Sequence, residues 1–183
     1  MSVQIRRLVG TSPGTSGAVD ITSINTRLNA EDAHTTAGTT NTILKPTSGT
    51  NRSYWCVTRL YYNGAGTGTI NNIKWFTDGA NSLGTGRGLV VNTATGYVQA
   101  TGTEGTTGTE LNTTNYATLA GAPTNAFDYT TSSPLAVSGS VTDPSSEYFG
   151  DYVVMQATVA DTASAGVSTA ETISCRYDTT MTS

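Results

Sequence analysis

The chain has 183 residues, enough for one domain with a single buried core, and no stretch approaches the ~20 apolar residues of a membrane span. Only 12% of the residues are charged, and threonine and glycine are abundant, which argues against both a disordered chain and long solvent-facing helices. The formal net charge is −4, so the basic surface that nucleic-acid binding requires is not expected.

The charges are divided unevenly along the chain. Residues 1–100 carry eight basic side chains against four acidic ones, a balance of +4. Residues 101–183 carry Arg176 against nine acidic residues, a balance of −8. Complementary charges of this kind favour docking of one copy, or of a partner, onto another. Alternatively, both halves contribute strands to the same sheets and the charges mix.

Residues 1–17 are predicted to form an N-terminal arm and a flexible link, before a β-sandwich domain at 18–183. The arm alternates like a strand, and such an arm can pair with the sheet of a neighbouring copy. Its candidate assembly residues are Val3, Ile5, Arg6, Arg7 and Val9. Alternatively, this segment is the first strand of its own sheet. The basic pair is followed by no long apolar run, so we expect no signal peptide.

Two apolar segments in the first half are predicted as strands. Residues 53–62, SYWCVTRLYY, are apolar on both faces, which is typical of a central strand. Residues 69–79 follow a glycine-rich turn, place Ile73 and Trp75 on one face, and end at an Asp-Gly turn. Shorter strand candidates are 18–28, 88–92, 96–100 and 134–141.

The second half contains a threonine-rich segment and two more strands. Threonine suits strands, while glycine and asparagine suit tight turns, so residues 101–115 are open between strand and polar loop. Residues 151–161 and 171–179 alternate with period two, and the short linker between them predicts an antiparallel hairpin. The whole pattern predicts an all-β fold: a single antiparallel β-sandwich, jelly-roll or immunoglobulin-like.

No residue pattern predicts catalysis, a metal or a cofactor. The segment Gly10–Gly14, GTSPG, matches the G-x-S-x-G nucleophile motif, but the residues after Ser12 favour no helix, and His34 is the sole histidine. One histidine and two separated cysteines exclude a zinc site. The acidic segment 143–151 lacks the spacing of a calcium loop. We therefore expect no enzyme activity.

Trp55 and Trp75 have two interpretations. They could stack on sugar rings, as in a carbohydrate-binding β-sandwich module. Alternatively, they lie on the apolar faces of their strands and pack in the core. Cys56 and Cys175 also have apolar neighbours, where a reduced thiol behaves as a small hydrophobe.

The chain resembles small virion proteins of tailed bacteriophages, particularly head decoration or cement proteins, in YWCVTRLYYNGAGTGTINNIKWFTDG and GYVQATGTEGTTGTELN. The resemblance covers most of the chain and lies in its general character: Thr/Gly/Asn-rich strands, few lysines and no catalytic cluster. No single motif is diagnostic, so no functional residue is carried over. It implies a β-sandwich located in the virion and made in the host cytoplasm, with the major capsid protein and copies of itself as partners, as a homo-oligomer such as a trimer. The alternative function is a receptor- or carbohydrate-binding module of a phage tail, a fibre or a bacterial surface protein.

Overall fold

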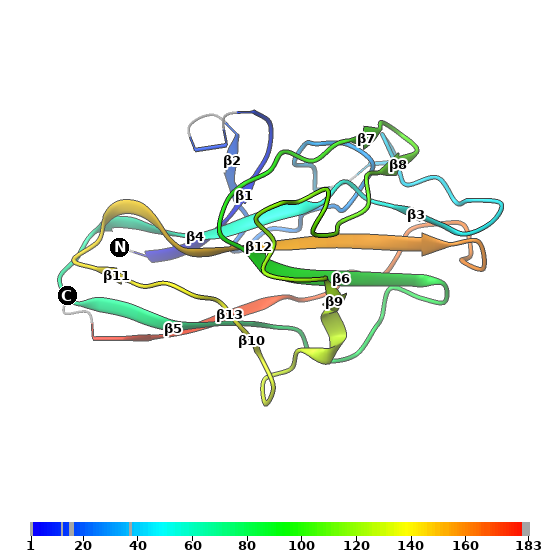
Figure 1. Ribbon diagram of the computed structural model, residues 1–183. Coiled ribbons are helices and arrows are strands. Elements are labelled where there is room, and N and C mark those ends of the chain that lie inside the picture. Colours follow the sequence, from blue (N-terminus) through cyan, green and yellow to red (C-terminus); the bar gives the residue numbers. More distant parts are fainter. Residues whose placement is uncertain (1, 12, 15–16, 37, 181–183) are drawn as a thin grey trace.

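The computed structural model describes residues 2–11, 13–14, 17–36 and 38–180. These residues form β-strands and one short 3-10 helix, η1 (Ala126–Asp128), and they contain no α-helix. None of their segments therefore meets the length and apolar character of a membrane-crossing helix. The strands make antiparallel sheets that pack against each other, so the predicted all-β sandwich is confirmed (Figure 1).

The large sheet has seven strands, in the order β2-β1-β4-β12-β6-β9, with β3 pairing with β12 outside this path. Its strands are β1 (Ser2–Leu8), β2 (Ala18–Asp20), β3 (Thr50–Arg52), β4 (Cys56–Ala65), β6 (Arg87–Ala94), β9 (Thr124–Asn125) and β12 (Ser145–Ala160). The predicted central strand is confirmed, because β4 lies between β1 and β12. Since β12 of the acidic half lies between β4 and β6 of the basic half, the two halves of the chain interleave.

The small sheet is built on β5 (Thr69–Phe76), which pairs with three other strands. These are β10 (Leu135–Ala136), β11 (Val141–Thr142) and β13 (Ser174–Thr179). The predicted hairpin of residues 151–161 and 171–179 is therefore wrong, because β12 belongs to the large sheet and β13 to the small one. Inward and outward side chains alternate along every strand, whether it pairs with the strand before it or crosses to the opposite sheet. The alternation therefore does not tell these two arrangements apart.

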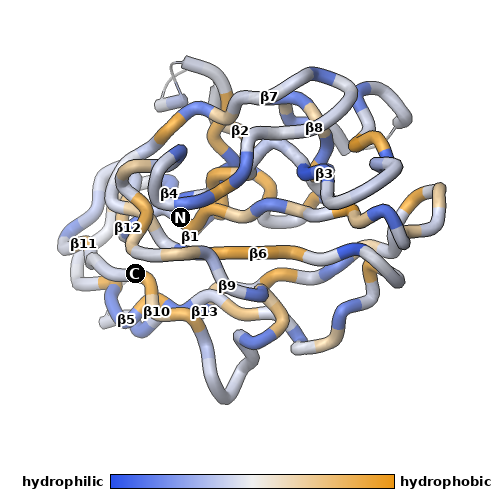
Figure 2. The backbone as a smooth tube through the Cα atoms, turned by 45° about the vertical axis from the view of Figure 1, so that its right-hand side comes forward, coloured by the Kyte–Doolittle hydropathy of each residue, from blue (hydrophilic) through white to orange (hydrophobic). Residues whose placement is uncertain are grey.

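The inner core fills the space between the two sheets. Apolar residues of the large sheet meet those of β5 there, and Figure 2 shows hydrophobic segments on strands of both sheets. The buried members are Cys56, Leu60, Tyr62, Ile70, Ile73, Trp75, Leu89, Val91, Ala126, Phe127, Val137, Val141, Phe149, Val153 and Met155. Their burial stabilises the sandwich by about 25 cal/mol for each Å² of apolar surface removed from water.

Residues 95–120, named the cover here, lie over part of the outer face of the large sheet, the face turned away from the small sheet. The cover includes a hairpin of β7 (Gly102–Thr103) and β8 (Thr107–Gly108), so residues 101–115 combine strand and loop. Its Leu111 and Tyr116 pack against Val57 and Val154 of the large sheet in a second core. Gly108 is required by this packing, because a Cβ there would stand 2.1 Å from the Ser53 carbonyl oxygen.

The predicted N-terminal arm is not confirmed. Strand β1 pairs antiparallel with β4 from Ser2 opposite Asn63 to Leu8 opposite Val57, and its second half also pairs with β2. This matches the other interpretation, in which the segment is the first strand of its own sheet. Val3 and Ile5 pack against the inner core. An internal strand buries these apolar side chains, which a free arm would leave in water.

Candidate functional site

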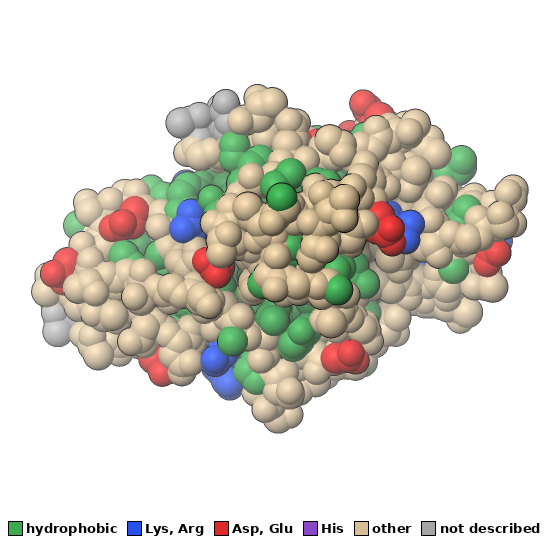
Figure 3. All heavy atoms as spheres, in the orientation of Figure 1, with side chains coloured by type: hydrophobic (Ala, Val, Ile, Leu, Met, Phe, Trp, Pro, Cys, Tyr) green, Lys and Arg blue, Asp and Glu red, His purple; other side chains and the backbone are tan. Residues whose placement is uncertain are grey.

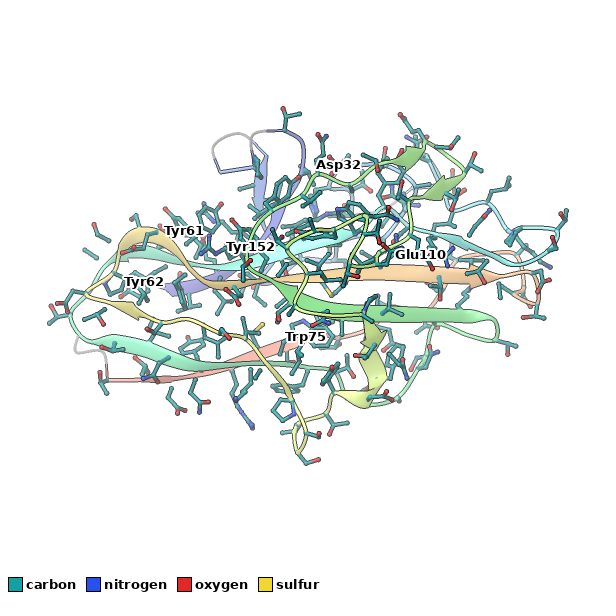
Figure 4. All side chains as sticks on the ribbon, in the orientation of Figure 1. Asp32, Tyr61, Tyr62, Trp75, Glu110 and Tyr152 are labelled. Carbon is teal, nitrogen blue, oxygen red and sulfur yellow. The ribbon has the colours of Figure 1, made fainter. Side chains whose placement is uncertain are left out.

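Six polar and aromatic side chains form what is named here the tyrosine-arginine face. They lie on the outer face of β1, β4 and β12 at the margin of the cover, and all are partly exposed. Tyr148 and Tyr152 also pack against the second core beside the cover. The members are Gln4, Arg6, Arg59, Tyr61, Tyr148 and Tyr152. Strand register brings them together, because Tyr61 is opposite both Gln4 and Tyr148. Figure 4 shows that Tyr61 lies outside the sandwich, while Tyr62, one residue later, lies between the sheets.

Arg6 stacks on the aromatic rings of this face. Its guanidinium carbon lies 3.5 Å from the centroid of the Tyr61 ring and 5.9 Å from that of Tyr148. The two rings meet edge to face at 4.9 Å. Arg6 also donates from Nε and Nη2 to Gln4 Oε1, at 3.1 and 2.9 Å. Cation-π contact and hydrogen bonds thus hold the guanidinium against the Tyr61 ring.

Arg59 is held by an irregularity in β12. The register of β12 against β4 shifts between Phe149 and Val153, which is a β-bulge. Arg59 Nε donates to the carbonyl of Gly150 in this bulge at 2.7 Å, and its Nη1 donates to the Tyr152 hydroxyl at 3.2 Å. Its guanidinium carbon is 4.6 Å from the Tyr152 ring centroid. The bulge therefore fixes a second guanidinium beside a second aromatic ring.

The tyrosine-arginine face carries positive charge without a carboxylate partner. Across the described residues the one ion pair joins Arg52 to Glu110, at 2.5 Å, and it lies outside this face. Figure 3 shows a basic side chain among hydrophobic ones over β4. Asp20 lies opposite Arg6 in the pairing of β1 with β2, but no carboxylate of the described residues forms an ion pair with either guanidinium of this face. A partly exposed cation without an ion pair can attract an acidic surface.

A second feature, named here the acidic hollow, is an open depression of about 460 Å³. Polar side chains dominate its lining: Glu31, Asp32, Tyr54, Gln99, Thr101 and Glu104. The Asn41 Nδ2 group donates to Glu31 Oε2 and to Glu104 Oε1, each at 2.7 Å. Asp32 Oδ2 accepts from the Gly10 amide at 2.9 Å and from Gln99 Nε2 at 2.8 Å. Amide groups, not cations, therefore hold the three carboxylates of the hollow.

The carboxylates affect the tyrosines around them. Burial, and after it the charges of Glu104 and Asp32, raise the pKa of Tyr54 above 10.0. Burial and then Asp32 also raise the pKa of Tyr97. No cluster of three or more His, Cys, Asp or Glu side chains in the described ranges could hold a metal ion. The hollow therefore combines negative charge with hydrogen-bond acceptors.

The two tryptophans do not form a sugar platform, because both are buried. Trp55 is 3% exposed, donates from Nε1 to the Val98 carbonyl at 2.9 Å, and meets Tyr116 of the cover edge to face at 5.4 Å. Trp75 is 1% exposed in the inner core, beside Tyr129. A sugar needs an accessible ring face. The apolar faces of their strands are buried within the fold, which corrects the sugar-stacking interpretation.

The arm residues occupy different surroundings, so they do not form one contact surface. Val3 and Ile5 pack against the inner core, whereas Arg6 belongs to the tyrosine-arginine face. Arg7 is 2% exposed and donates from Nη1 to Thr26 Oγ1 and to the Arg27 carbonyl, at 2.7 and 2.6 Å. The last candidate assembly residue is Val9, whose amide donates to the carbonyl of Gly17 at 2.7 Å.

The nucleophile motif cannot be placed, since Ser12 lies outside the described residues. His34 Nδ1 lies 3.0 Å from Thr26 Oγ1, the hydroxyl that also accepts from Arg7. Burial, and after it the charge of Arg7, lower the pKa of His34 below 6.5. Burial and Arg7 thus favour the neutral form of this histidine, whose ring contacts Thr26.

Both cysteines are free thiols in the described structure. Cys56 belongs to β4 in the large sheet, and Cys175 lies opposite Trp75 in the small sheet. Burial raises the pKa of the Cys175 thiol to about 12 and also raises that of Cys56. Burial therefore disfavours the thiolate, which is the nucleophilic form, at both positions.

Sequence reasoning missed most of the tyrosine-arginine face. Tyr148 lies before the alternating segment 151–161, and Tyr152 lies at its start. The bulge in β12 interrupts the period-two pattern between these two residues. The available signal was the run of outward positions on β4, where Arg59 and Tyr61 follow Val57. Comparisons of the chain with protein-family models, curated proteins and solved structures give no match.

Proposed function

We propose that this chain is a non-enzymatic structural protein of a virus particle, a decoration or cement protein that stabilises a phage head through protein-protein contacts. The observation that carries the proposal is the tyrosine-arginine face. Two guanidinium groups lie on partly exposed tyrosine rings there, and neither meets a carboxylate. Tyrosine and arginine are the residue types enriched at the energetic centres of protein interfaces.

The shape of the fold supports a contact role. The face lies on a sheet whose strands are held from both sides, by the inner core and by the cover. Such a surface changes little on binding and loses little conformational entropy. The virion location comes from the resemblance of the sequence, and many copies acting together can stabilise a shell without any chemistry.

A sugar-binding role receives less support from the same surface. The tryptophans that would stack on a sugar are buried. The Tyr61 ring is already covered on one side by the Arg6 guanidinium. A glycan array checks this alternative, because saturable binding to a sugar would favour it over the contact role.

Incubation of the purified chain with phage heads that lack it tests the proposal. We expect saturable attachment, counted as copies per head, and a higher temperature of head disruption, because a ligand that binds only the intact shell stabilises it. The variant Arg6→Glu/Arg59→Glu, altered on the tyrosine-arginine face, should attach less. The variant Lys74→Glu/Arg176→Glu makes the same change in net charge on the small sheet, so it is the matched control and should attach as the wild type does. Failure to attach to any head or tail structure would contradict the proposal.

A further inference from the structure

We propose that two copies of the chain join when the tyrosine-arginine face of one docks on the acidic hollow of the other. The inference names the partner of the face, and in this respect it rests on the proposed function as a contact protein. It requires no capsid, so the purified chain alone tests it.

The face offers donors that are not used within the chain. Arg6 donates from Nε and Nη2 to Gln4. Arg59 donates from Nε to Gly150 and from Nη1 to Tyr152. Each guanidinium carries five N–H groups in a fixed fork, so each keeps further donors for a partner. Because the rings beneath hold them in place, little side-chain entropy is lost when they bind a carboxylate.

The hollow offers the matching acceptors. Glu31 and Glu104 share one amide group of Asn41, and Glu31 also accepts on Oε1 from Asn29. Asp32 receives its two hydrogen bonds on Oδ2. A carboxylate has about four acceptor positions, so each keeps acceptors for a guanidinium. Among the described side chains no cation forms an ion pair with these carboxylates, since the one ion pair joins Arg52 to Glu110. The hollow is therefore the complement of the face in both charge and hydrogen bonding.

The two surfaces do not contact each other within one copy. Figure 4 places Tyr61 and Asp32 at separate positions above the large sheet. The face includes Arg59 and Tyr61 of β4, whereas the hollow lies between the cover and residues 31–33. Docking therefore needs a second molecule. A contact between two different surfaces joins copies head to tail, so they form a closed ring where the rotation between neighbours closes and an open filament where it does not.

Sedimentation equilibrium of the purified chain gives the first measurement. We expect an average mass that rises with concentration at low salt and an association that weakens at least ~10-fold between about 0.05 and 0.5 M salt, because charge complementarity is screened. A monomer at every concentration and at both salts would overturn the inference.

Two variants remove one surface each. Arg6→Glu/Arg59→Glu reverses the charge of the face, and Lys74→Glu/Arg176→Glu makes the same change in net charge on the small sheet. Glu31→Gln/Glu104→Lys alters the hollow, and Asp161→Lys/Glu171→Gln is its match outside both surfaces. We expect each surface variant to weaken association at least ~10-fold, because like charges then face each other, and each control to leave it unchanged.

An equimolar mixture of the two surface variants separates docking from misfolding. Each variant keeps the surface that the other lacks, so the mixture should regain association that neither shows alone. A misfolded variant cannot restore it, and circular dichroism of each variant should match the wild type. If well-folded variants stay monomeric when mixed, the inference is wrong, while attachment to phage heads would still support the proposed function.

Discussion

The outer face of the large sheet has a covered half and an open half that share β4 and β12. In the covered half, Val57 and Val154 are 1% and 0% exposed beneath the cover. In the open half, Tyr61 and Tyr148 of the same two strands are partly exposed and carry Arg6 on their rings. The side chains thus change from aliphatic to aromatic and cationic where the cover ends. Alternation tells which residues share a face, whereas side-chain type tells whether the chain itself buries them.

The largest effect is expected in the covered half. Trp55→Ala should lower the free energy of unfolding by about 3 to 5 kcal/mol, because it leaves a cavity against Tyr116 and removes the hydrogen bond to Val98. Urea denaturation measures this loss. A cost below ~1 kcal/mol would mean that the cover contributes little to the stability of the sheet and that the covered half does not differ from the open half in this respect.

The second prediction concerns the polar connection between cover and sheet. Gln156, 1% exposed on β12, accepts from the Leu111 amide at 2.8 Å and donates to the carbonyls of Ser53 and Thr109, at 2.8 and 2.7 Å. Gln156→Leu should cost about 2 to 3 kcal/mol, because buried backbone groups lose their partners. Hydrogen exchange at the Leu111 amide should accelerate.

Gln4→Leu makes the same substitution in the open half and serves as the control. Gln4 bonds only a partly exposed guanidinium, so we expect a change within about 0.5 kcal/mol. Equal losses of unfolding free energy for the two variants would show that burial of Gln156 does not raise the cost of losing its hydrogen bonds.

A smaller effect is expected for the aromatic centre of the open half. Tyr61→Ala removes the ring contacts with Arg6 and Tyr148 at a partly exposed site, so we expect a loss of only about 1 kcal/mol in thermal or urea unfolding. The same variant should weaken self-association. A stability loss as large as that of Trp55→Ala would indicate that both halves serve the fold alone.

The smallest effect concerns β1, where Arg6 lies on the open half and Arg7 is buried next to His34. Since burial and Arg7 lower the pKa of His34 in the folded chain, the unfolded chain takes up the proton first as pH falls. The contribution of neutral His34 is therefore fully present above its unfolded pKa of about 6.5 and is lost progressively as pH falls toward the folded pKa. The wild type minus His34→Gln difference in unfolding free energy should decline below pH 6.5. A pH-independent difference would exclude this assignment.

The sequence predicts much of the fold and little of the candidate site. Residues 53–62 predict β4 because a strand buried on both faces is apolar throughout, and the period of residues 171–179 predicts β13. The sheet to which β13 belongs cannot be predicted, since the outward pattern of a hairpin and of a crossing is the same. The open half depends on contacts between Arg6 and residues of β4 and β12 that lie more than 50 positions away. The acidic hollow likewise joins residues 31–33 to residues 99–104.

The two unpaired thiols have a consequence for the medium in which the protein can work. Cys56 and Cys175 belong to different sheets, and both are free thiols, Cys56 buried and Cys175 partly buried. Folding therefore depends on neither oxidants nor reductants, and added dithiothreitol should leave the unfolding midpoint where it was. A fold that contains no disulfide among its described cysteines keeps the same covalent structure in a reducing medium.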